Sequence, residues 1–403
     1  MTKQAKGIAM FIKRDLEPAL KRYASKFPVV AVIGPRQAGK TTLTKEVFPA
    51  HKYFSFEDPD TLEIVRADPR DFLEKNYGTP GVILDEFQNE PQILSYIQGI
   101  VDRDRRPGYF ILTGSHNFLM NEAISQSLAG RVALLTLLPL SLKELNNQKL
   151  LTNDLDASLF TGGYPDIFSR NIHPTEFYPQ YTKTYVERDV RQLINVVNLS
   201  TFQRFMRLCA GRIGQILNVA SLADDCNVSV PTINSWISIL EASYIIFLLQ
   251  PHFEDFRKRL IKSPKLYFYD TGLACWLLKI DSSEQINEHY LRGGLVESLV
   301  ISELYKQFYN QAQEPSVYFW RDSHGHEIDC LLDYGTKLIP IEIKSGKTIN
   351  QRFFDALHYW CTLANIDQAQ AYIIYGGTEN HELSSGKIIS WKEAADIVKP
   401  PAT

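Results

Sequence analysis

The feature that most constrains the fold is a glycine-rich segment directly after an apolar run. Residues 29–33, VVAVI, are rich in β-branched side chains, which predicts a strand buried on both faces. The next residues, GPRQAGKT at 34–41, match the pattern G-x-x-x-x-G-K-[ST], and a segment of helical composition follows. A strand, a glycine loop and a helix in this order predict an open α/β sheet with a phosphate site at the helix N-terminus.

The residue types in this loop suit a nucleotide phosphate. Gly34 and Gly39 allow backbone N–H groups to turn toward phosphate oxygens, while Lys40 would reach the β- and γ-phosphates and Thr41 would ligate Mg²⁺. An ordinary glycine-containing turn is the alternative, but a chain of this composition holds on the order of 0.01 such matches by chance. We therefore expect ATP and Mg²⁺ as cofactors, with the nucleotide bound by Gly34, Pro35, Arg36, Gln37, Ala38, Gly39, Lys40, Thr41 and Thr42.

Two later apolar runs end in residues that complete such a site. The run at 81–84 ends in Asp85, which would hold Mg²⁺ through water, and Glu86, which would orient the attacking water. The run at 109–112 is followed directly by Thr113-Gly-Ser115. Because the carboxyl ends of parallel strands share one edge of a sheet, we expect these groups beside the glycine loop. The remaining strands are expected within 53–58 and 132–140.

Together, Gly34–Thr41, Leu84–Glu86 and Thr113–Ser115 resemble the AAA+ branch of the P-loop ATPases. The resemblance implies a sheet ordered 5-1-4-3-2, a sensor role for Thr113 near the γ-phosphate, and a helical lid, expected over 141–200. It also puts Arg131 at the arginine-finger position, where it would serve a neighbouring subunit. The active form would then be a homo-oligomeric ring, with six members favoured. A surface cation at a helix end is the alternative for Arg131.

The segment 201–280 predicts two short helices and a hairpin with a basic tip, which resembles a winged helix-turn-helix. Ser221 is expected to cap the first helix and Ser229 the second. The core face of the second helix carries Ile233, Trp236, Ile237 and Leu240. Sequence-independent contact with DNA phosphates is expected from Arg257, Lys258, Arg259, Lys262 and Lys265. A weaker basic patch comprises Lys3, Lys6, Lys13, Arg14, Lys21, Arg22 and Lys26. A module used only for packing, with a solvated basic loop, is the alternative.

Beyond residue 281 the pattern is a helix, three strands and a further helix. Asp329 lies in the second strand, Glu342 and Lys344 share one face of the third, and Glu297 lies on the preceding helix. This set resembles the PD-(D/E)XK nuclease fold. The resemblance implies that Asp329 and Glu342 bind Mg²⁺, that Lys344 assists the attacking water and that Glu297 is an auxiliary acid. An inherited fold whose acids now serve packing or binding is the alternative.

The order of these parts resembles a large bacterial and archaeal family of predicted ATPases whose C-terminal half is a domain of unknown function. The resemblance covers essentially the whole chain. The expected domains are an AAA+ nucleotide-binding domain at 1–140, a helical lid at 141–200, a winged helix-turn-helix at 201–280 and a nuclease-like domain at 281–403. The fold class is α/β throughout, apart from the helical lid and the winged helix.

The composition limits how the chain could contact DNA and where in the cell it is expected. A net charge of −3 over 403 residues excludes a chain-wide basic field, so DNA contact would need local patches. The five cysteines lie far apart, which is typical of thiols in a reducing compartment. No apolar segment reaches the roughly 18 residues of a membrane span. We therefore expect a cytoplasmic protein without a membrane partner.

Three functions remain open on sequence grounds. The leading hypothesis is an oligomeric ATPase that binds and remodels or translocates DNA, with a C-terminal domain that binds or cleaves it. The alternative is an ATP-dependent signalling switch or scaffold that binds a protein partner, with an inactive nuclease-like domain. A small-molecule kinase is disfavoured, because a strand ending in two acids followed by a sensor strand is typical of hydrolysis.

Overall fold

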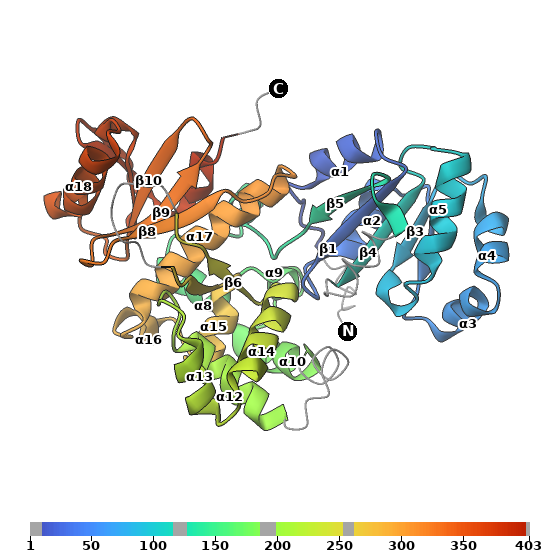
Figure 1. Ribbon diagram of the computed structural model, residues 1–403, viewed down its shortest axis with the longest axis horizontal. Coiled ribbons are helices and arrows are strands. Elements are labelled where there is room, and N and C mark those ends of the chain that lie inside the picture. The colour runs from blue at the N-terminus through green and yellow to red at the C-terminus, as the bar shows by residue number, and fades with distance from the viewer. Residues whose placement is uncertain (1–9, 116–126, 186–198, 253–261, 400–403) are drawn as a thin grey trace, which may run out of the picture.

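The structure is a computed structural model that describes residues 10–115, 127–185, 199–252 and 262–399. A parallel sheet, a helical middle part and a mixed C-terminal sheet follow one another along the chain (Figure 1). Helix α17 (Arg292–Asn310) packs against the C-terminal sheet through β10 and against the middle part through β7. None of the helices in these ranges is long and apolar enough to cross a membrane.

The N-terminal sheet has five parallel strands in the order β5-β1-β4-β3-β2, which confirms the predicted order. The strands are β1 (Val29–Gly34), β2 (Lys52–Ser55), β3 (Val82–Asp85), β4 (Phe110–Ser115) and β5 (Val132–Thr136). All six residues of β1 are buried, as its apolar run predicts. The register pairs Gly34 with Ser115 and Asp85 with Thr113, so the functional strand ends meet at one edge.

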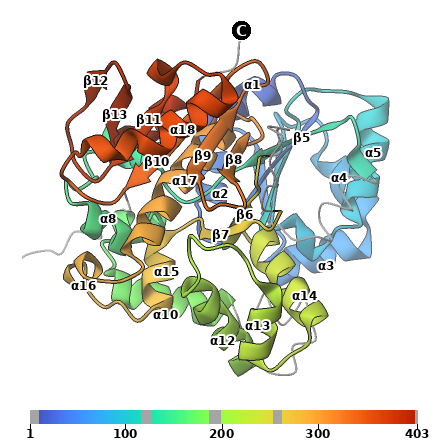
Figure 2. The ribbon, with the colours of Figure 1, turned by 60° about the vertical axis from the view of Figure 1, so that its left-hand side comes forward.

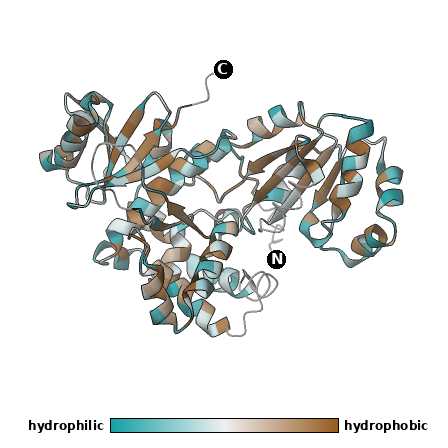
Figure 3. Ribbon diagram, viewed as in Figure 1, coloured by the Kyte–Doolittle hydropathy of each residue, from teal (hydrophilic) through white to brown (hydrophobic). Residues whose placement is uncertain are grey.

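Helices cover both faces of this sheet. They are α1 (Glu17–Ala24), α2 (Lys40–Val47), α3 (Pro59–Ala67), α4 (Pro69–Asn76) and α5 (Ile93–Arg103). Two separate apolar clusters form as a result: α1 and α2 contribute to one, and α3, α4 and α5 contribute to the other. Figure 3 shows the apolar strands enclosed by helices whose outer faces are polar. The alternation of strand and amphipathic helix thus produces the expected α/β layers.

The middle part is mainly helical. Its elements are α7 (Leu142–Asn147), α8 (Leu155–Thr161), α9 (Pro165–Ser169), α10 (Pro174–Tyr185), α12 (Leu199–Ala210), α13 (Val219–Cys226), α14 (Val230–Ala242), β6 (Ile246–Leu249), β7 (Lys265–Phe268), α15 (Thr271–Leu277) and α16 (Glu284–Asn287). Ser229 caps α14 as predicted. The prediction for α13 is wrong, because Asn218 caps it and accepts a hydrogen bond from the Ser221 backbone N–H at 3.0 Å. Asn is as good a cap as Ser, and the helix therefore starts earlier in the chain than the predicted cap at Ser221 would place it.

The C-terminal sheet has the order β12-β13-β11-β10-β9-β8 and is seen from another side in Figure 2. Its elements are β8 (Val317–Arg321), β9 (Glu327–Asp333), β10 (Leu338–Lys344), α18 (Asp355–Ala364), β11 (Tyr372–Tyr375), β12 (His381–Leu383) and β13 (Gly386–Ser390). The first three strands are antiparallel, and α18 then leads to β11, which runs parallel to β10. One continuous core joins the middle part to α17 and this sheet, from Leu138 to Val398. All five cysteines are buried and free.

Candidate nucleotide and metal sites

The glycine loop turns between β1 and α2 in a backbone conformation that its sequence allows. Gly34 has φ of +147°, and a Cβ atom there would lie 2.1 Å from the carbonyl oxygen of Leu137. Gly39 has φ of +91° at the start of α2. A side chain is therefore excluded at the first glycine by contact with backbone and disfavoured at the second by conformation.

The predicted phosphate and metal residues meet at the carboxyl edge of the sheet. Lys40 is 5% exposed, and its Nζ donates to the carbonyl oxygens of Gly34 at 3.1 Å and Pro35 at 2.8 Å. The Asp85 carboxylate accepts hydrogen bonds from the hydroxyls of Thr41, at 2.9 Å, and Thr113. Lysine, hydroxyl and carboxylate therefore lie together where a Mg²⁺-bound phosphate would sit.

Tyr53 of β2 is a member of this cluster that the sequence analysis missed. Its hydroxyl donates to Asp85 Oδ2 at 2.7 Å. Burial, reinforced by the hydrogen bond to Asp85, raises the pKa of Tyr53 above its ordinary range. The tyrosine therefore stays protonated and helps to orient Asp85. Its position in an adjacent parallel strand could have indicated this role.

Glu86 follows β3 in a left-handed conformation, with φ of +54°. Its carboxylate accepts a hydrogen bond from the Gln88 side-chain amide, which also donates to the Ser115 hydroxyl at 3.0 Å. Gln88 therefore links Glu86 to the end of β4. This arrangement holds the carboxylate at the same edge as Asp85.

A pocket of about 340 Å³ adjoins the glycine loop. Its wall includes the segment 10–12, the start of α2, Glu86 and residues of α9. A volume of this size is in the range of ordinary ligand pockets, which begins near roughly 300 Å³. The middle part thus covers the nucleotide edge through α9, in the region where a lid was expected.

Arg14 has a different role from the one that the sequence analysis gave it. It is buried, at 4% exposure, rather than part of a basic surface patch. Its guanidinium donates to the carbonyl oxygens of Ala38 and Leu138, both at 2.6 Å, and to Glu144 Oε1 at 2.9 Å. Arg14 therefore fixes the glycine loop to the segment after β5. The acid belongs to the capping box that Ser141 and Glu144 form at the start of α7.

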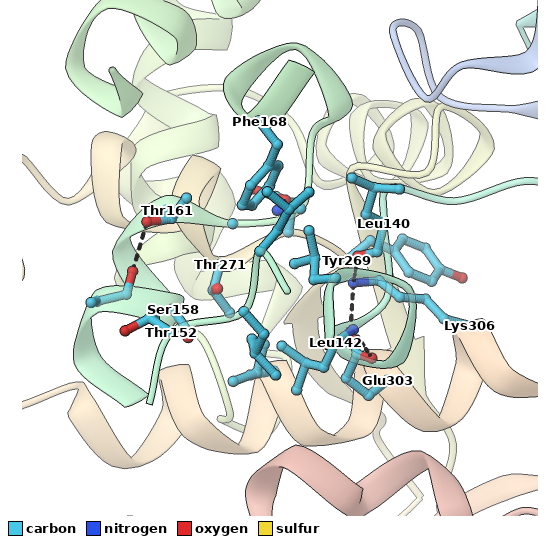
Figure 4. Close-up of a pocket in the computed structure, with 18 residues that line it drawn as sticks. Leu140, Leu142, Thr152, Ser158, Thr161, Phe168, Tyr269, Thr271, Glu303 and Lys306 are labelled. Carbon is cyan, nitrogen blue, oxygen red and sulfur yellow. Dashed lines mark hydrogen bonds and ion pairs between the residues drawn. The ribbon is translucent and has the colours of Figure 1, made fainter. Parts of the chain in front are cut away.

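A second buried ion pair joins α17 to the same segment (Figure 4). Lys306 donates to Glu303 at 2.7 Å and to the Leu140 carbonyl oxygen at 3.1 Å, while Glu303 accepts from the Leu142 N–H at 2.7 Å. A cavity of about 190 Å³, whose wall includes six leucines, lies beside this pair. Residues 140–142 therefore connect the nucleotide edge to the C-terminal part.

Arg131 lies just before β5, at the opposite edge of the sheet from the glycine loop. Its guanidinium makes two hydrogen bonds to the Asp102 carboxylate, at 2.7 and 3.0 Å. Val132 pairs with Val29, the first residue of β1. A six-residue strand, roughly 20 Å long, therefore separates Arg131 from the phosphate site of its own chain.

The predicted C-terminal acids also come together, from three different elements. Glu297 lies on α17, Asp329 on β9, and Glu342 and Lys344 on β10. Lys344 Nζ donates to Glu342 Oε1 at 2.5 Å, and Asp329 accepts from the Ile343 backbone N–H at 2.8 Å. We name Glu297, Glu327, Asp329 and Glu342 the carboxylate cluster.

Electrostatics in the carboxylate cluster favour a bound cation. Burial, followed by the nearby Asp329 carboxylate, raises the pKa of Glu342 to about 8 and that of Glu297 to about 7. Glu342 is 7% exposed, and its Oε2 has no hydrogen-bond partner among the described residues. Buried carboxylates that repel each other and leave an oxygen unpaired fit a hard divalent cation.

The donor set for such a cation is small. In the described ranges, no three His, Cys, Asp or Glu side chains are arranged to hold a metal ion. The fit therefore rests on the two carboxylates of Asp329 and Glu342, with water as the remaining ligand. Mg²⁺ commonly binds in this way, through one or two carboxylates.

The basic hairpin differs from its prediction at one residue. Lys265 is 3% exposed, and its ammonium forms ion pairs with Glu327 and, at 3.7 Å, with Glu297. It is therefore buried in the carboxylate cluster and cannot contact DNA phosphates. Lys262 is exposed, as expected. The predicted contacts Arg257, Lys258 and Arg259 lie outside the described residues.

We expect Glu342→Gln to reduce the loss of stability at alkaline pH. The pKa of Glu342 is about 8 in the folded chain and 4.5 ordinarily, so folding favours its protonated form. Its contribution is complete below pH 4.5 and is lost as the pH rises through about 8. From pH 5.5 to 8.5 in EDTA, the thermal midpoint of the wild type should fall by at least roughly 3 °C more than that of the variant. If the thermal midpoints of the wild type and the variant fell equally, ionisation of Glu342 would not destabilise the folded chain.

Three protein families match successive parts of the chain. An AAA domain matches residues 26–146, a domain of unknown function (DUF8612) matches 152–284, and a second one (DUF4143) matches 292–394. The first match confirms that the N-terminal part is an AAA-type ATPase domain. The resemblance of the C-terminal part to nucleases stays a prediction.

Similar proteins were found among curated sequences and among solved structures. The Walker-type ATPase of Pyrococcus abyssi is 13% identical, with 66% of this chain and 96% of that one covered at a TM-score of 0.44. Thermotoga maritima RuvB is 17% identical, with 58% of this chain and 85% of that one covered at a TM-score of 0.29.

The sequence relatives are more similar than these structures. Uncharacterized proteins of Mycobacterium tuberculosis and Mycobacterium bovis are each 30% identical over 378 residues, which is 92% of this chain and 82% of the relative. Because it leaves out only about 8% of this chain, the shared region overlaps the AAA domain and both domains of unknown function. The chain therefore belongs to the family of these mycobacterial proteins, with an AAA-type ATPase domain at its N-terminal end.

Proposed function

We propose that the chain is a Mg²⁺-dependent ATPase that acts on DNA as a ring of identical subunits. The observation that carries the ATPase proposal is the meeting of Lys40, Thr41, Asp85 and Thr113 at one edge of the sheet, with Glu86 in the same pocket wall. Mg²⁺, held by Thr41 and through water by Asp85, would neutralise charge on the phosphates. Glu86 would orient the attacking water, and Thr113 would sense the γ-phosphate.

The position of Arg131 supports the ring. The residue is a strand length from the phosphate site of its own chain, so it can reach a γ-phosphate only in a neighbouring subunit. Its pairing with Asp102 holds the guanidinium at the end of α5. In this proposal Arg131 acts as an arginine finger, stabilising charge in the transition state.

The remaining parts would engage DNA. We assign Mg²⁺ binding to Asp329 and Glu342, water activation to Lys344, and an auxiliary role to Glu297. The pKa values raised by mutual repulsion and the unpaired Glu342 oxygen support a metal there. The helices α12–α14 with the β6–β7 hairpin would act as a winged helix. We assign phosphate contacts to Arg257, Lys258, Arg259 and Lys262. Lys265 is buried and is no longer assigned a phosphate contact.

DNA binding tests this proposal. We expect the chain to bind single-stranded, duplex or branched DNA at low salt, with an affinity that falls steeply as salt rises. Changing Arg257, Lys258 and Arg259 together to Gln should weaken binding to all sequences by a similar factor. The matched control changes the exposed Arg103, Arg105 and Arg106 to Gln. Absence of binding to every DNA form, with and without ATP, would contradict the proposal.

A nucleotide-dependent switch or scaffold is the second candidate, and one observation favours it. The exposed face of α14 carries Asn234, Ser235 and Ser238 and has no lysine or arginine. A recognition helix of this composition suits a protein surface better than the major groove. Slow ATP turnover that no DNA changes, together with a stable protein partner, would favour this function.

A further inference from the structure

Lys265 places a positive charge from the middle part inside the carboxylate cluster of the C-terminal part. It lies at the start of β7, whereas the acids come from α17, β9 and β10. Its Nζ contacts Glu327 and lies 3.7 Å from Glu297 Oε2, an oxygen that also accepts a hydrogen bond from the Tyr267 hydroxyl at 2.8 Å. Lys265 and Tyr267 therefore complete the site from a second module.

The cluster keeps this buried lysine charged. Burial acts to lower the pKa of Lys265, but the carboxylates of Glu297, Glu327 and Asp329 outweigh it, and the pKa is raised. An ammonium at 3% exposure is stable only when such partners offset its lost hydration. The four acids of the cluster face three cations, which are Lys265, Lys344 and Arg321.

The Lys265 charge weakens the attraction of the cluster for a divalent cation. With Lys265 in place, the net charge of these seven groups is −1 when all are ionised, and without it the net charge is −2. The Lys265 ammonium interacts electrostatically with the Asp329 carboxylate. A divalent cation bound by Asp329 and Glu342 would therefore be repelled by Lys265 through a poorly solvated interior.

We propose that the Lys265 ammonium is the resident counter-cation of the carboxylate cluster, and that a divalent cation binds there in competition with it. This inference rests on the metal site assigned under the proposed function. It adds a regulation: as long as the Lys265 ammonium stays in the cluster, the affinity of the cluster for metal is lowered.

Binding of Mn²⁺, without nucleotide, to the full chain tests the competition. Lys265→Met and Lys265→Gln should each bind Mn²⁺ roughly tenfold more tightly than the wild type in calorimetric titrations, because a repelling charge is removed. Lys265→Arg retains the charge and should keep the wild-type affinity. Lys279→Met, which removes an exposed charge from the middle part, is the matched control and should change the affinity less than twofold.

Asp329→Ala separates the two possible failures. If this variant binds Mn²⁺ as the wild type does, the assigned metal site is wrong and the proposed function of the cluster fails. If Asp329→Ala loses Mn²⁺ but both neutral Lys265 variants match the wild type, only the competition is overturned.

A measurement on the wild type covers the case in which the Lys265 variants do not fold. Acylation of lysines, followed by mass spectrometry, should show slow labelling of Lys265 in EDTA and severalfold faster labelling at saturating Mn²⁺. Lys306, buried in its pair with Glu303, is the internal control and should not change. Equal labelling of Lys265 in EDTA and in Mn²⁺ would overturn the inference.

Discussion

Lys40→Ala is expected to weaken ATP binding by at least roughly 100-fold. The ammonium is buried beside the glycine loop and already within hydrogen-bond reach of two carbonyl oxygens, so a small movement brings it to the β- and γ-phosphates. Charge-assisted hydrogen bonds contribute about 1.5–3 kcal/mol each, and losing two of them accounts for this factor. The fold should persist, because the loop is also held by Arg14.

Titration of a fluorescent ATP analogue in the presence of Mg²⁺ measures this effect. Lys75→Ala is the matched control, since Lys75 is an exposed lysine of the same module, on α4. The control should bind as the wild type does. Equal affinity of Lys40→Ala and the wild type would show that the nucleotide binds elsewhere.

Glu86→Gln is expected to retain ATP binding and to slow hydrolysis by at least roughly 100-fold. A positioned general base contributes about 10²–10⁴ in rate, and the amide keeps the size of the side chain while losing its basicity. The hydrogen bond of the Glu86 carboxylate is to Gln88 and not to the glycine loop, so the affinity for ATP should change little. The variant should therefore retain unhydrolysed ATP.

Single-turnover hydrolysis and the nucleotide recovered with the protein after gel filtration distinguish these steps. Glu90→Gln is the control, because Glu90 lies four residues away and pairs with Arg66 instead. We expect wild-type turnover for Glu90→Gln and retained ATP only for Glu86→Gln. If Glu86→Gln hydrolysed ATP at a rate within twofold of the wild type, Glu86 would not be the general base.

Local patterns predicted which side chains meet at the carboxyl edge of the N-terminal sheet. A buried strand, a glycine loop and a helix are contiguous in sequence, and parallel strands end at a common edge, so Asp85 and Thr113 could be placed beside Thr41. The acids of the C-terminal site were also predicted, because Glu342 and Lys344 lie two residues apart on one face of β10.

Buried charges with distant partners could not be predicted in this way. Arg14 bonds to Glu144, 130 residues away, and Lys265 to Glu327. Charged residues are mostly exposed, so a lysine near a basic loop is first assigned to the surface. The packing of β7 against α17, together with the ion pair to Glu327 of β9, brings Lys265 to its acids. Glu327 and Tyr267 were missed for the same reason.

Steady-state ATP turnover, with and without single-stranded, duplex and forked DNA, tests the central claim most directly. Arg131→Ala should be measured in parallel. We predict severalfold stimulation by at least one DNA form and its loss in the variant, because the finger must act between subunits. Turnover that no DNA form changes, in the wild type and the variant alike, would contradict a DNA-coupled ring and favour the nucleotide-dependent switch.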